Sequence, residues 1–262
     1  MLRCLFLLLL SGYAYTSECV VLLCNKNYFP KFLQTVSELT SRGNYHGDIC
    51  LLIGNDLVGD ELLNNEVIKN NRVIIQHFPD LQFPDSFLKD TRKLPTFHKQ
   101  FQYNKFHVFN TYFKHWDTLL YIDCGMSIYS DIRPILETRQ MGTLLAHSDA
   151  YPNYAWKLRD QFKKDKKYYK KLREKFNLDT DYFQTTMMLF DTSIIQENTF
   201  NDLYQLTLEY PISRTNDQGI IALYFTHIVP VWKQIPVRNE VTFFYDFFKR
   251  NKEEKYIMIK YP

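Results

Sequence analysis

Short apolar runs alternate along the chain with longer stretches in which apolar and polar positions are mixed. The clearest runs cover residues 20–23, 49–53, 73–75 and 119–122. They are rich in Val, Ile and Leu and are bounded by Asn, Gly and Asp, which is typical of buried strands. Between them, residues 32–39 and 97–116 place apolar side chains three and four positions apart, which predicts helices with one face against a sheet. Strands alternating with helices predict a mostly parallel α/β sheet flanked by helices.

The second half of the chain continues the same alternation. The pattern predicts strands at 143–146 and 182–191, helices at 156–175 and 192–208, a helix that opens at Asn216–Gly219, and a last apolar run within 255–262. The strand at 182–191 has an unusually polar start. Repeats, low-complexity linkers and Gly/Pro-rich breaks are absent from the sequence, so residues 18–262 are predicted to form one domain.

The first 17 residues have the layout of a secretory signal peptide. Arg3 is followed by the apolar stretch 4–10 and then by small and polar residues, with cleavage expected near Thr16 and Ser17. The apolar stretch is shorter than the roughly 20 residues that a membrane-spanning helix needs. We therefore expect the lumen of the secretory pathway or secretion, and no stable membrane span. If the leader is instead a first buried strand, the protein would be cytoplasmic.

Charge and cysteine content exclude several classes of function. A net charge of +3 gives no bias towards nucleic acid, and the basic run 163–173 is typical of a solvated helix face. Cys19, Cys24, Cys50 and Cys124 lie outside the leader, without a CxxC pair or metal-type spacing. Redox chemistry is therefore not expected, and buried free thiols are.

Asp123 is the first candidate for chemistry. It ends the apolar run 119–122 abruptly, and ligands of α/β sheets bind beyond the carboxyl ends of such strands. A carboxylate there can hold a phosphate-bound metal or a sugar hydroxyl. The alternative is an aspartate that only caps the next turn.

Several motifs in order resemble those of one enzyme family. They are the turn Asn25–Tyr28 after the first strand, Lys105, the strand and turn Tyr121–Gly125, Asp149, the strand 182–190 with Gln184, and Asp217 with Gln218. Over residues 19–262 the chain resembles the glycogenin-like family-8 glycosyltransferases, which have the GT-A fold, a Rossmann-type, mostly parallel sheet flanked by helices.

The resemblance implies an activity and a role for each motif. It implies transfer of a hexose, most often from a UDP-linked nucleotide diphosphate sugar and with retention of configuration, to a glycan, protein or lipid acceptor. Catalytic or sugar-binding roles fall to Asp149, Gln184 and Asp217. Roles in binding the donor fall to Asn25, Tyr28, Lys105, Asp123, Gly125 and Lys260. Asp123 would also be the ligand of a Mn²⁺ or Mg²⁺ ion.

Two departures from the family pattern leave the use of metal open. Gly125 stands where the Asp-x-Asp motif has its second carboxylate, and Lys260 stands where the family has a late metal-binding His. The enzyme would then bind metal through Asp123 and water, with Asp131 or His227 as weaker helpers, or neutralise the diphosphate without metal through Lys105 and Lys260. A third alternative is a catalytically inactive protein that binds a glycan or nucleotide sugar. A nucleotidyltransferase is disfavoured, because the first strand is not followed by a Gly-rich phosphate loop.

Overall fold

The structure is a computed structural model that describes residues 17–84, 100–151, 154–236, 245–247 and 256–261. The predicted signal peptide, apart from Ser17, lies outside these residues. Within them, none of the helices combines the length and the apolar character that a bilayer span requires.

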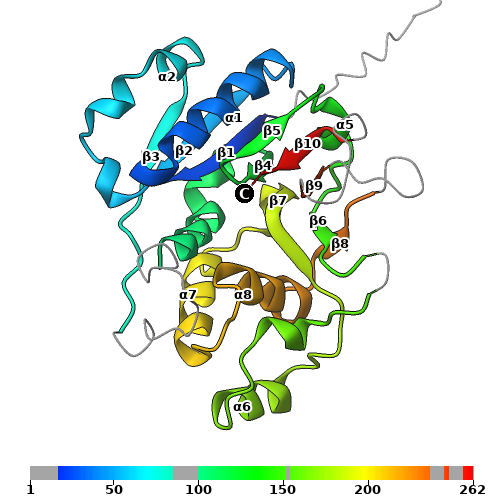
Figure 1. The fold of residues 1–262 in the computed structure, drawn as a ribbon. Coiled ribbons are helices and arrows are strands. Elements are labelled where there is room, and N and C mark those ends of the chain that lie inside the picture. Colours follow the sequence, from blue (N-terminus) through cyan, green and yellow to red (C-terminus); the bar gives the residue numbers. More distant parts are fainter. Residues whose placement is uncertain (1–16, 85–99, 152–153, 237–244, 248–255, 262) are drawn as a thin grey trace, which may run out of the picture.

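Two sheets form the centre of the molecule (Figure 1). The strands are β1 (Glu18–Cys24), β2 (Asp48–Ile53), β3 (Ile74–His77), β4 (Thr118–Ile122), β5 (Met126–Ile128), β6 (Leu144–Ser148), β7 (Phe183–Asp191), β8 (Trp232–Gln234), β9 (Tyr245–Phe247) and β10 (Met258–Lys260). The large sheet has the order β3-β2-β1-β4-β7-β6-β8, in which β7 alone runs antiparallel to its neighbours. This confirms the predicted mixed, mostly parallel α/β fold.

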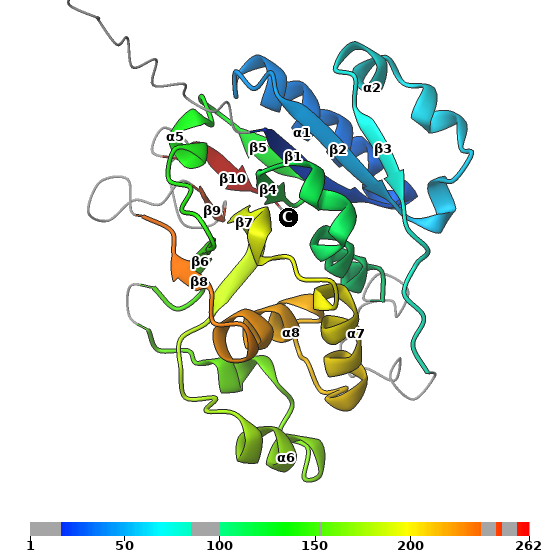
Figure 2. The same cartoon turned by 180° about the vertical axis from the view of Figure 1, so that it is seen from behind.

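Helices cover both faces of the large sheet. They are α1 (Phe29–Ser41), α2 (Glu66–Asn70), α5 (Arg133–Leu136), α6 (Tyr168–Lys175), α7 (Thr199–Glu209) and α8 (Asp217–Leu223). Alternate residues of β1 belong to two hydrophobic clusters, one shared with α1, α2 and α5 and the other with α6, α7 and α8. Figure 2 shows α1 and α2 with β1–β3, and α7 and α8 on the side of β7.

The predicted helix at 97–116 is wrong in type from Tyr103 onwards, whereas residues 100–102 are α-helical and residues 97–99 lie outside the described part of the chain. From Tyr103 the described part consists of two 3-10 helices, η4 (Tyr103–Phe109) and η5 (Thr111–His115). Asn110 interrupts them, because its backbone is extended and its side chain accepts a hydrogen bond from the Tyr112 amide at 2.9 Å. A side-chain oxygen that bonds its local backbone competes with a continuous helix in this way.

Two other predicted helices begin later than expected. In the stretch 156–175 the α-helix starts only at Tyr168, because the Asp165 carboxylate accepts the amide N–H groups of Lys167 and Tyr168, each at 2.8 Å. In the stretch 192–208 a 3-10 turn precedes α7, which starts at Thr199. The Asp191 carboxylate caps that 3-10 turn by accepting from the Ser193 amide.

The topology brings several strand ends to one edge. β1 lies between β2 and β4, and the strand order reverses there, so the region beyond Cys24 and Ile122 is the expected ligand position. β6 ends and β7 begins at the same edge, because both pair there as antiparallel partners. The second sheet, β5-β10-β9, extends from the turn after β4.

Candidate functional site

A tight turn after β4 presents Asp123 at this edge. The Asp123 amide donates to the Thr186 carbonyl at 2.9 Å, which ties the turn to the start of β7. Gly125 has a φ of +83°, a left-handed conformation that glycine adopts at little cost. Its amide donates to the Thr35 hydroxyl at 3.1 Å, on α1.

Lys105, from η4, lies buried beneath this turn. Its Nζ is 3.2 Å from Asp123 Oδ1 and 3.0 Å from Asp217 Oδ2. It also donates to the carbonyl and the hydroxyl of Thr185, each at 3.2 Å. An ammonium group has three protons, so these four acceptors use all of them. Lys105 as a phosphate ligand stays a prediction, and in this structure its ammonium forms ion pairs with two carboxylates.

Burial and charge act against each other in this cluster. Burial by itself would raise the pKa of Asp123, but the ammonium groups of Lys105 and Lys260 hold it below its usual range. Burial would lower the pKa of Lys105, yet the two carboxylates raise it. For Asp217 burial prevails and the pKa is raised. Asp123 is therefore the carboxylate most firmly held in its ionised form.

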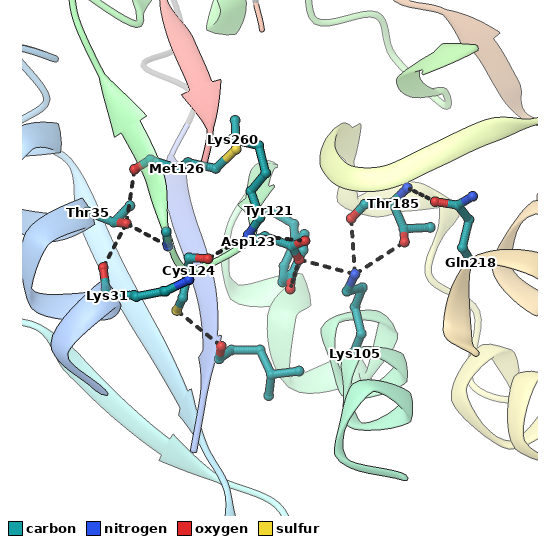
Figure 3. Close-up of polar contacts among 12 residues, drawn as sticks. Lys31, Thr35, Lys105, Tyr121, Asp123, Cys124, Met126, Thr185, Gln218 and Lys260 are labelled. Atoms are coloured by element: carbon teal, nitrogen blue, oxygen red, sulfur yellow. Dashed lines mark hydrogen bonds and ion pairs between the residues drawn. The ribbon is translucent and has the colours of Figure 1, made fainter. Parts of the chain in front are cut away.

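Lys260 approaches Asp123 from the opposite side. It is the last residue of β10 and pairs with Met126 of β5, so its backbone is tied to the Asp123–Gly125 turn. Its Nζ donates to the Cys124 carbonyl at 2.6 Å and lies 3.7 Å from Asp123 Oδ2. Figure 3 shows the Asp123 carboxylate between the two ammonium groups.

A second polar group forms between β6 and β7. Asp149 follows β6, and its Oδ2 accepts from the Tyr182 hydroxyl at 2.5 Å. Its Oδ1 accepts from Gln184 Nε2. Gln184 is buried and Asp149 is half-buried. The pair is thus fixed at the same sheet edge as Asp123, since Gln184 is followed directly by Thr185, which bonds Lys105.

The turn after β1 holds the two remaining candidates. Asn25 is buried, and its Oδ1 accepts from the Tyr28 amide at 3.2 Å, while its Nδ2 has no hydrogen-bond partner among the described residues. A buried unsatisfied amide is rare and calls for a functional explanation. Tyr28 is 37% exposed, with Lys31 Nζ 5.9 Å from its ring centre.

The two suggested metal helpers have other partners. The Asp131 carboxylate accepts from the Arg133 amide at 2.8 Å and from Asn44 Nδ2 at 3.2 Å, so it is bonded to the first residue of α5 and to the loop after α1. His227 lies in a π-helix, with Nε2 3.2 Å from the Thr180 hydroxyl. Neither side chain contributes to the group around Asp123.

Sequence reasoning missed three side chains of the site. The Tyr121 hydroxyl donates to Asp123 Oδ1 at 2.9 Å, and the Thr185 hydroxyl donates to Asp217 Oδ2 at 2.8 Å. Tyr182 bonds Asp149, as described above. The polar start of the strand at 182–191 was the available signal for Tyr182 and Thr185, because buried polar side chains need partners.

The donor set does not fit the predicted divalent ion at Asp123. Both oxygens of this carboxylate already face an ammonium group. A dication about 4 Å from one ammonium would be repelled by about 8 kcal/mol at an effective dielectric constant of 20. Hard divalent ions also need several oxygen ligands, and among the described residues no three His, Cys, Asp or Glu side chains form such a group.

Comparisons with known proteins agree with this geometry. The sequence profile described as Glycosyl transferase family 8 matches residues 19–259, whereas no curated protein sequence matches significantly. The structure is similar to that of an active-site mutant of LgtC, with a TM-score of 0.62, 14% identity, and coverage of 93% of this chain and 86% of that chain. It is also similar to the apo structure of WbbM, a bifunctional glycosyltransferase, with a TM-score of 0.55, 16% identity, and coverage of 96% of this chain and 46% of that chain. The chain therefore belongs to glycosyl transferase family 8 and is a glycosyltransferase with a GT-A-like fold.

Proposed function

We propose that the protein transfers a hexose from a UDP-linked sugar to a glycan, protein or lipid acceptor, with retention of configuration. The observation that carries this proposal is the position of Asp123 between two lysines at the switch point of the sheet, beside the fixed pair of Asp149 and Gln184. Ligands of open α/β sheets bind at such a point.

The turn after β1 is the proposed site of the nucleoside. Asn25 supplies an unpaired amide donor and Tyr28 a partly exposed aromatic ring. Uracil offers carbonyl acceptors and a flat face, which match an amide and a ring. Because β1 and β4 are adjacent and parallel, a nucleoside beyond β1 would place its diphosphate beside the turn after β4.

Asp149 and Gln184 are the proposed sugar ligands. Their mutual hydrogen bond and the Tyr182 hydroxyl fix both side chains before any ligand binds, and such preorganisation lowers the cost of orienting a sugar. Glycosyl transfer passes through an oxocarbenium-like state, which a nearby carboxylate stabilises. Asp217 as a sugar contact remains a prediction, because its carboxylate here faces Lys105 and Thr185.

A donor screen with matched variants tests the proposal. We expect the protein to release UDP from one or a few UDP-hexoses when a suitable acceptor is supplied. Asp149→Asn should lower that rate by about 100-fold or more, as loss of one transition-state contact does. Asp131→Asn, the same substitution at a carboxylate bonded to Arg133 and Asn44 away from Asp149, should retain it. Equal rates in both variants would contradict the assigned sugar site.

We further propose that the protein acts in the lumen of the secretory pathway or after secretion. The support is the leader at residues 1–17 with its charged start, short apolar stretch and small-residue end. Secreted protein should begin near Glu18 on N-terminal sequencing. Mature protein that starts at Met1 and stays in the cytosol would contradict this.

A further inference from the structure

We propose that the Lys260 ammonium takes the place of a divalent ion, so that the nucleoside diphosphate binds without metal. This inference rests on the proposed function, since it concerns the diphosphate of the same donor. It follows from the disagreement between the family expectation of a metal and the side chains that surround Asp123.

Of the two lysines at Asp123, Lys260 is the one that is able to bind a phosphate group. Its side chain is 21% exposed, against 7% for Lys105. Among the described residues its Nζ makes one hydrogen bond, to the Cys124 carbonyl, and one longer ion pair, to Asp123. An ammonium group has three N–H donors, so Lys260 keeps capacity for a phosphate oxygen. Lys105, by contrast, has four acceptors within 3.2 Å.

The turn at Gly125 leaves little room for the second carboxylate of an Asp-x-Asp motif. Its φ of +83° disfavours any side chain with a Cβ, and a Cβ built there would lie 3.0 Å from Lys31 Cδ. Lys31 thus occupies the side of the turn where the second carboxylate of an Asp-x-Asp motif would begin. Gly125 contributes no carboxylate to the turn, and Lys260 brings an ammonium group to it, so the local charge favours an anion over a cation.

The second sheet holds Lys260 in register with this turn. β10 pairs with β5 from Met258 to Lys260, and the Tyr261 amide donates to the Gly125 carbonyl at 3.4 Å. The Tyr129 and Tyr261 hydroxyl groups lie 2.7 Å apart and join the two chain segments. The ammonium group is therefore carried by a paired strand, so its position does not depend on recruiting an ion from solution.

Calorimetric titration of the full mature protein with UDP tests the inference. Wild type would be titrated in EDTA and again with Mn²⁺, alongside Lys260→Met, Lys260→Arg and Lys233→Met. Lys233 is an exposed strand lysine whose Nζ contacts Gln140 Oε1 at 3.2 Å, and it serves as the matched control. Thermal unfolding of each variant shows whether it is folded.

We expect wild type to bind UDP equally well, within about twofold, in EDTA and in Mn²⁺. Lys260→Met should weaken binding in EDTA by about 10- to 100-fold, as loss of a charge-assisted hydrogen bond does, while Lys260→Arg and Lys233→Met stay close to wild type. UDP binding that requires Mn²⁺, or full affinity in folded Lys260→Met, would overturn the inference and leave the proposed function standing. Failure to bind UDP under both conditions would overturn the UDP-sugar function and the inference together.

Discussion

Replacing Lys105 by methionine removes one ammonium group from the centre of the site and leaves a side chain of similar length. The Lys105 side chain is 7% exposed, and its Nζ lies 3.2 Å from Asp123 Oδ1 and 3.0 Å from Asp217 Oδ2. Removing one partner of a buried ion pair costs about 3–5 kcal/mol, because the remaining charge is left unpaired. Methionine fills much of the lysine volume, so the added cost of a cavity is small.

The loss of unfolding free energy in Lys105→Met should grow as the pH rises. Without Lys105, the pKa of Asp123 and of Asp217 in the folded protein rises, because burial raises both and the cation that opposes it is gone. A carboxyl group whose folded pKa lies above its unfolded value costs stability as pH rises from about 3.9 through the folded pKa. The deficit of Lys105→Met should therefore be largest near pH 7.5 and smaller near pH 5.

Urea unfolding followed by tryptophan fluorescence measures the difference in unfolding free energy between Lys105→Met and wild type. Buried Trp116 is one reporter. Lys233→Met should stay within about 0.5 kcal/mol of wild type, as surface substitutions do. Adding Asp217→Asn to Lys105→Met removes one stranded carboxylate and should restore part of the lost stability. A loss of unfolding free energy below about 1 kcal/mol in Lys105→Met at pH 7.5, or a loss that is larger at pH 5, would mean that Lys105 does not stabilise the buried carboxylates.

Three further changes have defined outcomes. Tyr121→Phe removes the hydrogen bond to Asp123 and should lower the unfolding free energy by about 0.5–1.5 kcal/mol, measured in urea; an unchanged value would mean that the bond is not formed. Asp149→Asn should leave the calorimetric affinity for UDP within about threefold, because Asp149 is assigned to the sugar, and a large loss would place it at the nucleotide instead. Burial raises the pKa of Cys50 to about 12, so at pH 8 its thiolate fraction is about 1,000-fold below that of a thiol with a pKa of 9. Iodoacetamide should therefore modify Cys50 only after unfolding, as peptide mass spectrometry would show, whereas rapid labelling of native protein would contradict its burial.

The pattern of apolar runs predicted the sheet well. β1, β2, β4 and β7 lie where runs of Val, Ile, Leu and Met predicted them, because a strand buried on both faces needs an almost continuous apolar sequence. Helix starts were predicted less well. Asn110 and Asp165 redirect the local backbone through their own side-chain hydrogen bonds, and such bonds compete with periodicity in a way that spacing alone does not reveal.

The sequence pointed to most residues of the candidate site but not to the contacts that they make with one another. Strand-end position led to Asp123, and the ordered motifs led to Lys105, Asp149 and Gln184. The ion pair of Lys105 with Asp217 joins residues more than a hundred positions apart. It forms because η4 and α8 pack against each other, and α8 also packs against β7. The pairing of β10 with β5, which brings Lys260 to the turn, is likewise a tertiary fact that neither segment signals by itself.

The rate of UDP release from a UDP-hexose, measured with and without metal, is the most direct test of metal-free transfer supported by Lys260. The preferred donor would be incubated with metal-stripped wild-type protein and an acceptor, in EDTA and in Mn²⁺. We expect turnover in EDTA within about twofold of that in Mn²⁺, and its loss in folded Lys260→Met but not in Lys233→Met. Turnover that appears only when Mn²⁺ is added would contradict the assignment of Lys260 as the charge that serves the diphosphate.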